Sequence, residues 1–67
     1  MSYFVIALVS KADHSQIQGF FSADDEDLVE SAVDALQFSQ AEIDEEVDMC
    51  NSNWDIEDNL IFIAKQI

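Results

Sequence analysis

The stretch YFVIALV, residues 3 to 9, decides the fold that we predict for this chain. It is apolar without interruption and rich in β-branched and aromatic side chains, which is typical of a strand covered on both faces or a central strand of a small sheet. The run has no basic flank before it and is far shorter than the roughly 20 residues needed to cross a bilayer. We therefore interpret it as a strand, and not as a signal or a membrane span.

Two further strands are predicted around this one. The residues IQGFFS, 17 to 22, follow a polar turn and pair antiparallel with the first strand in our interpretation. Gly19, the only glycine, indicates a bulge or a close backbone approach. Residues 53 to 59 alternate apolar and acidic side chains, which predicts a short edge strand or an extended loop, with a tight turn at Asp58 and Asn59. Residues 60 to 67, LIFIAKQI, close the chain as another strand.

Two helices are predicted between the second and the last strand. In residues 22 to 39, a polar cap and a first turn full of acids precede apolar side chains at helical spacing. The capping-box pattern of Ser39 and Glu42 predicts that a second helix starts at once and runs from about Gln40 to Cys50. The predicted fold is one α+β domain over residues 1 to 67, in the order β-β-α-α-β. Both helices lie on one face of a small antiparallel sheet of about three strands, with the option of a fourth short one.

The charge balance restricts the kind of partner. Fifteen acids stand against Lys11 and Lys65, for a net charge of −13, and no base lies between these two lysines. Nearly half of the residues are apolar, so we expect a folded core and not a disordered acidic tail. Direct binding to nucleic acid or to an anionic membrane is electrostatically disfavoured, and a basic protein is the natural complement. Cys50, the single cysteine, fits a reducing cytoplasm better than a secreted setting.

Metal sites and catalytic motifs do not account for the acids. Neither acidic run contains the glycine that an EF-hand calcium loop requires, and a zinc site needs about four ligands where only His14 and Cys50 exist. The chain has no glycine-rich phosphate loop and no recognisable nucleophile motif. We therefore predict no metal, no cofactor and no enzymatic activity.

Carboxylates recur at helical spacing in both predicted helices. Glu26, Glu30 and Asp34 fall at i, i+4 and i+8, and the acids of the second helix repeat the arrangement without a compensating lysine. Each like-charge pair costs roughly 0.2 to 0.5 kcal/mol, so about four to six pairs cost on the order of 1 to 3 kcal/mol. That is large for a domain whose core supplies about 3 to 5 kcal/mol. A solvated face and adaptation to high salt are the alternatives to partner binding, and the five phenylalanines and seven isoleucines weaken the salt interpretation.

Trp54 is the most informative single residue of the acidic C-terminal half. One interpretation is an aromatic side chain that caps the core, because large aromatic residues are mostly buried. The other is an interface anchor, since Asp55, Glu57 and Asp58 surround it in sequence and such a composition suits a partner pocket lined by arginine. Both interpretations stay open at the level of the sequence.

In size, charge and cytoplasmic character, the chain resembles the small acidic inhibitors of anti-CRISPR and anti-restriction type that phages encode and that mimic nucleic acid. The resemblance rests on DDEDLVESAVD, EIDEEVD and WDIED. It implies a non-enzymatic inhibitor that occupies the nucleic-acid-binding groove of a basic host protein in the bacterial cytoplasm. The residues assigned to partner binding are Glu26, Glu30, Asp34, Glu42, Glu45, Glu46, Asp48, Trp54 and Asp55. The alternative is an acidic adaptor that binds a basic protein without displacing nucleic acid, and a homodimer through the apolar strands is compatible with either function.

Overall fold

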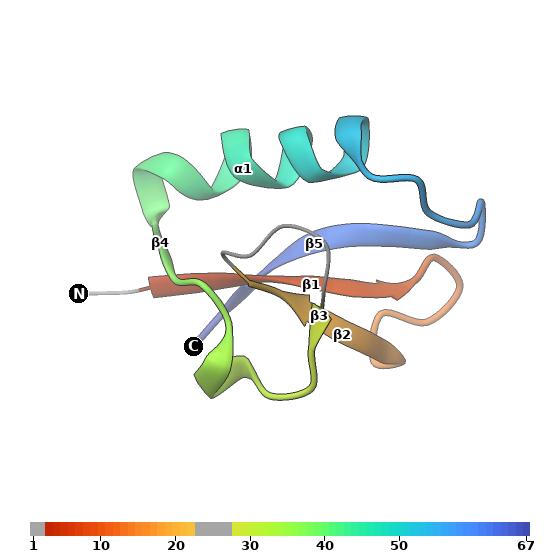
Figure 1. Ribbon diagram of the computed structural model, residues 1–67, viewed down its shortest axis with the longest axis horizontal. Coiled ribbons are helices and arrows are strands. Elements are labelled where there is room, and N and C mark those ends of the chain that lie inside the picture. The colour runs from red at the N-terminus through yellow and green to blue at the C-terminus, as the bar shows by residue number, and fades with distance from the viewer. Residues whose placement is uncertain (1–2, 23–27) are drawn as a thin grey trace.

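The fold is built around β1 (Tyr3–Ser10), which contains the apolar stretch from which the prediction starts. The computed structural model describes residues 3–22 and 28–67, and Figure 1 shows the arrangement of its elements. After β1, these elements are β2 (Ile17–Phe21), β3 (Leu28–Val29), the 3₁₀ turn η1 (Ala32–Asp34), β4 (Phe38–Ser39), the helix α1 (Gln40–Asn53) and β5 (Leu60–Gln66).

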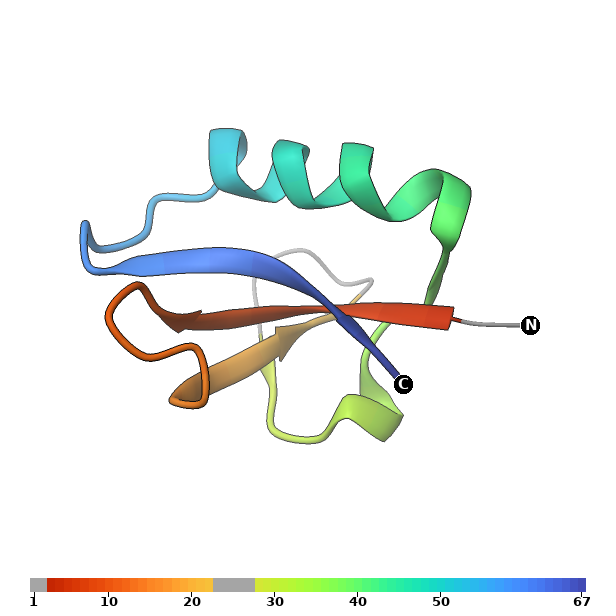
Figure 2. The same ribbon diagram turned by 180° about the vertical axis from the view of Figure 1, so that it is seen from behind.

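Both edges of β1 are used in the sheet. Along one edge, β5 pairs antiparallel with β1 over seven residue pairs, from Phe4↔Gln66 to Ser10↔Leu60. Along the other edge, β2 pairs with the C-terminal half of β1 and β4 with its N-terminal end, while β3 extends the sheet beyond β2. Seen from behind, β5 runs beneath α1 before its C-terminal half bends away from the helix (Figure 2). The prediction that residues 3 to 9 form a central strand is therefore confirmed.

Alternate side chains of β1 enter two separate hydrophobic clusters, because successive residues of a strand point to opposite faces. The cluster between the sheet and α1 contains Ile6, Leu8, Phe38, Ile43, Cys50 and Phe62. The cluster on the opposite face contains Val5, Ala7, Val9, Phe20 and Ala35. Residues 5 to 9 are at most 5% exposed, so β1 is covered on both faces, as its composition predicts.

The predicted helix over residues 22 to 39 is wrong where the structure describes it, in residues 28 to 39, while its residues 23 to 27 lie outside the described part. The order β-β-α-α-β and the placement of two helices on one face are wrong with it. In residues 3–22 and 28–67, α1 is the one α-helix, and it packs against a curled sheet of five strands. Leu28 and Val29 pair with β2 as a short strand. The side chain of Ser31 then caps η1 by accepting a hydrogen bond from the Val33 N–H at 3.2 Å.

The second face of β1 explains why this segment is not a helix. Val29 and Ala32 pack against the cluster on the face opposite α1, which we call the lower cluster. Without them, Val5, Ala7 and Val9 of this cluster would be exposed to water. A helix over the segment would also bring Glu30 and Asp34 one turn apart as like charges, which is unfavourable. Burial against the sheet and strand pairing with β2 therefore outweigh the local helical pattern. Val33, one of the apolar residues at helical spacing, remains 84% exposed as a result.

The second predicted helix is confirmed, with an end three residues later than expected. α1 begins at Gln40 and ends at Asn53. The hydroxyl of Ser39 donates a hydrogen bond to Glu42 Oε1 at 2.8 Å, so the predicted capping residues meet, although the Ser39 side chain makes no bond to the helix backbone. No helix of the described residues is both long enough and apolar enough to span a membrane.

Gly19 occupies a position where both predicted features are present. The pairing of β1 with β2 shifts register between Leu8↔Gly19 and Val9↔Ile17, which is a bulge. A Cβ atom on Gly19 would lie 2.8 Å from the Cβ of Leu28, so only glycine lets β3 approach β2 this closely. The turn at residues 58 and 59 is also confirmed, with the Leu60 N–H donating to the Glu57 carbonyl at 3.0 Å.

Candidate functional site

Helix α1 presents its carboxylates from a firmly held position. Ile43 and Cys50 are buried against the sheet, and Val47 packs beside them at helical spacing. The positions between these apolar residues face away from the core. They include the acids Glu42, Asp44, Glu45, Glu46 and Asp48, of which all but the half-buried Glu46 are exposed. Because α1 contains no basic residue, every charge on its solvent-facing side is negative.

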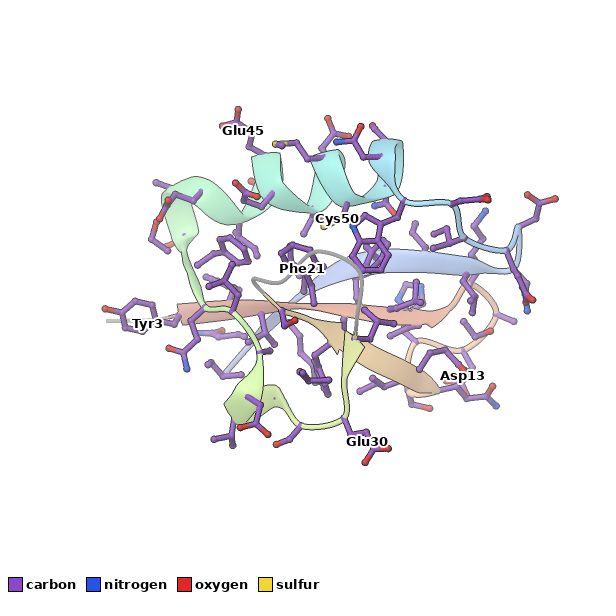
Figure 3. All side chains as sticks on the ribbon, in the orientation of Figure 1. Tyr3, Asp13, Phe21, Glu30, Glu45 and Cys50 are labelled. Carbon is purple, nitrogen blue, oxygen red and sulfur yellow. The ribbon has the colours of Figure 1, made fainter. Side chains whose placement is uncertain are left out.

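The five carboxylates surround the exposed part of the helix and do not form a single row. At 3.6 residues per turn, Glu42 and Glu46 lie on one flank, and Glu46 lines a hollow with Phe21 of β2. Glu45 points away from the sheet, as Figure 3 shows. Asp44 lies on the opposite flank, seven residues before Asn51, which contacts β5. A partner that approaches α1 from the side opposite the sheet therefore meets carboxylates on both flanks and on the outer side of the helix, between Glu42 and Asp48.

The structure does not unite all the acids that the sequence assigns to one surface. Glu30 and Asp34 lie on the segment that covers the lower cluster, and Figure 3 shows Glu30 and Glu45 on opposite sides of the molecule. Glu26 lies outside the described residues. The single acidic face that we expected from two adjacent helices is therefore not formed. A role of Glu30 and Asp34 in partner binding stays a prediction, separate from that of α1.

Trp54 follows α1 directly and packs on two aromatic residues of the sheet. Its ring centroid lies 5.8 Å from that of Phe21 and 5.3 Å from that of Phe62, with interplanar angles of 70° and 73°. These edge-to-face contacts are the favourable arrangement for aromatic pairs. The half-buried ring thus caps the core, as one of the two interpretations holds, and Asp55 beside it is exposed. An anchoring role of Trp54 and Asp55 in a partner stays a prediction.

A hollow of about 230 Å³ lies where α1 ends. Phe21, Glu46, Met49, Cys50, Asn53 and Trp54 line it. Burial raises the pKa of the Cys50 thiol, and the negative charge of Glu46 raises it further. The thiol is therefore held protonated and is a poor nucleophile. The chemistry that remains in the hollow is one carboxylate, one amide, two aromatic rings and a thioether.

Asn51 is a structural feature that the sequence interpretation missed. Its side-chain Nδ2 donates to the Phe62 carbonyl at 3.0 Å, and the Phe62 N–H donates to Asn51 Oδ1 at 2.9 Å. The Ile67 N–H donates to the Tyr3 carbonyl of β1. In β5, the odd-numbered residues therefore direct their backbone N–H and C=O groups toward β1, and the even-numbered residues direct theirs toward the outer edge. Asn51 therefore occupies the outer edge of β5 at Phe62. The sequence offered no signal for this, and Asn51 lies just beyond the predicted end of the second helix at Cys50.

Other site chemistry is limited in the part of the chain that the structure describes. In residues 3–22 and 28–67, no three side chains of histidine, cysteine, aspartate or glutamate are grouped so that they could hold a metal ion. The 15 acids of the sequence face two lysines, which can pair with a small minority of the carboxylates.

Comparison of the chain with protein-family models, with curated proteins and with solved structures found no match.

Proposed function

We propose that this protein is a non-enzymatic acidic binding protein that inserts α1 into a basic, nucleic-acid-binding groove of a host protein and excludes nucleic acid from it. The observation that carries the proposal is the composition and anchoring of α1, with five carboxylates, no base and two buried contacts to the sheet. By its resemblance to phage-encoded inhibitors, we propose that the protein acts in the cytoplasm of a bacterial host cell.

The charge density of α1 suits competition with nucleic acid. From Glu42 to Asp48 the helix rises by about 9 Å at 1.5 Å per residue. Five carboxylates over this length amount to roughly one negative charge per 2 Å, close to the one charge per roughly 1.7 Å along the axis of duplex DNA. A groove whose lysines and arginines match a phosphate backbone therefore encounters a comparable density of negative charge on α1, spread around the exposed part of the helix.

The fixed position of the helix matters as much as its charge. Ile43 and Cys50 attach α1 to the sheet at both ends, and Asn51 bonds it to β5. Carboxylates on a rigid helix lose less conformational freedom on binding than those on a disordered tail. Each can accept a charge-assisted hydrogen bond from an arginine or lysine of the partner. We expect association to be fast and the affinity to fall steeply as salt is added.

The test compares two double variants that change the net charge equally. Glu45→Lys/Asp48→Lys reverses two carboxylates on α1, whereas Glu30→Lys/Asp34→Lys reverses two on the opposite side of the sheet. Each immobilised protein is used to capture basic proteins from a bacterial lysate at low and at high salt. The captured protein is then mixed with its own nucleic acid in a mobility-shift competition.

The expected result is that the α1 variant loses capture and competition while the control retains both. Equal behaviour of the two variants, with both folds intact by circular dichroism, would refute a specific role of α1. If the unmodified protein supershifts the nucleic-acid complex and does not dissolve it, the protein is an adaptor, and the mimicry proposal is wrong.

A further inference from the structure

We propose that the hollow at the C-terminal end of α1 is a subsite for one arginine side chain of the basic partner. This inference rests on the proposed function and adds to it a position and a chemical group. The residues that line the hollow come from two parts of the chain, since Phe21 ends β2 whereas the others lie in the last two turns of α1 or directly follow the helix.

The walls of the hollow suit the two different parts of an arginine side chain. Trp54 and Phe21 supply aromatic surface, and a planar guanidinium is attracted to aromatic rings, most strongly to that of tryptophan. Met49, which is 48% exposed, supplies a flexible thioether at the same place. Its adaptable side chain can pack along the apolar stem that precedes the guanidinium.

The electrostatics of the hollow select a cation. Glu46 places a half-buried carboxylate in the wall, and the amide of Asn53 lines the hollow two helical turns further on. The hollow also lies at the C-terminus of α1, where the helix dipole is negative, and the last turn of α1 contains no basic residue. An anion would meet repulsion from the Glu46 carboxylate and from the negative end of the helix. A guanidinium gains from each of them and can bond to the carboxylate with two parallel N–H groups.

Arginine fits this site better than lysine for two reasons. The guanidinium is planar and weakly hydrated, so it stacks on aromatic rings at a lower desolvation cost than an ammonium group. Its several N–H donors also offer more hydrogen bonds than an ammonium group to the carboxylate and amide oxygens that line the hollow.

The experiment uses the single tryptophan of the chain as its reporter. Fluorescein-labelled hexa-arginine and hexa-lysine peptides are titrated with the protein at low salt, and binding is measured by anisotropy. Trp54 emission is followed in parallel with unlabelled peptide. The variants are Glu46→Gln, which removes the carboxylate of the hollow, and the control Asp13→Asn, which removes an exposed carboxylate of the turn between β1 and β2, outside α1.

We expect hexa-arginine to bind more tightly than hexa-lysine and to change Trp54 emission in a saturable manner. Glu46→Gln should weaken hexa-arginine binding about tenfold, as for the loss of a charge-assisted hydrogen bond, and Asp13→Asn by about twofold or less. Equal losses in the two variants, or binding with no change in Trp54 emission, would overturn the subsite and leave the wider proposal standing. Absence of any anisotropy change with either peptide would overturn the acidic-surface function as well.

Discussion

Replacing Asn51 by alanine tests whether a side chain of α1 holds the outer edge of β5. The substitution removes the hydrogen bonds at 3.0 and 2.9 Å to the backbone of Phe62. Each is worth about 0.5 to 1.5 kcal/mol, for a loss of about 1 to 3 kcal/mol. Alanine returns up to about 0.7 kcal/mol as the better helix former. The expected net loss is therefore about 1 to 2 kcal/mol, out of about 3 to 5 kcal/mol for a domain of this size.

Urea unfolding followed by Trp54 fluorescence and far-UV circular dichroism measures this loss. The free energy of unfolding of a small domain falls by about 1 kcal/mol per M of urea, so the urea concentration at the unfolding midpoint should fall by about 1 to 2 M. Ser52→Ala is the matched control, because Ser52 is exposed at the next position of α1, and its effect should stay within about 0.5 kcal/mol. Midpoints that agree for Asn51→Ala and Ser52→Ala would refute the reasoning.

The isosteric variant Asn51→Asp separates the two hydrogen bonds. Its carboxylate can still accept from the Phe62 N–H, but when ionised it faces the Phe62 carbonyl and has no proton to donate. Folding should then favour the protonated form and raise the pKa of the introduced carboxyl group above its unfolded value. The stability from the second bond is thus fully present below the unfolded pKa and is lost as pH rises through the folded one. A variant whose stability does not increase on acidification relative to Asn51→Ala would contradict this geometry.

Three further predictions concern the core, the glycine and the thiol. Phe62→Ala should lower the free energy of unfolding by about 3 to 5 kcal/mol, because the ring is 1% exposed between α1 and the sheet. Circular dichroism should therefore show a largely unfolded chain. A cooperative transition near that of the unmodified protein would contradict the assignment of the core. Gly19→Ala should lower the free energy of urea unfolding by about 1 to 3 kcal/mol, since its Cβ would lie 2.8 Å from the Leu28 Cβ. Gln18→Ala, at the exposed neighbouring position, is the control and should cost little. Equal losses in the two variants would count against the close approach of β3. Iodoacetamide should modify Cys50 more slowly in the folded protein than in urea, and the rate should rise at a higher pH than for a free cysteine. Glu46→Gln should shift that rise back toward lower pH. A folded-state rate equal to that in urea would show that the thiol is not buried.

Local signals were sufficient for the elements whose surroundings did not compete with them. The apolar run that forms β1 was recognisable because a strand buried on both faces has no polar alternation. The start of α1 was recognisable because Ser39 and Glu42 are suited to the first turn of a helix and do meet there. β5 and the turn before it followed from β-branched residues after an acidic loop.

The error over residues 22 to 39 arose where the local pattern and the tertiary environment disagreed. Leu28, Val29 and Ala32 are spaced as on a helix, yet they lie in β3 and η1. The sequence did contain a warning. A strand that is buried on both faces needs cover on both, and two helices on one face would leave the other exposed. The segment from β3 to β4 provides that cover in an extended form.

The sequence by itself determined the net charge and the presence of a packed core, because two lysines cannot neutralise 15 acids in any fold and nearly half of the residues are apolar. Only the tertiary structure decided where the charges lie. It puts the sheet between Glu30 and Glu45 and leaves α1 as the dense array of carboxylates. The tertiary structure also decided where the hollow lies and how the outer edge of β5 is covered at Phe62. Phe21 contacts Trp54, and Asn51 bonds to Phe62, because segments that are apart in the chain pack together. Such contacts depend on which segments cover the two faces of β1, which no local spacing encodes.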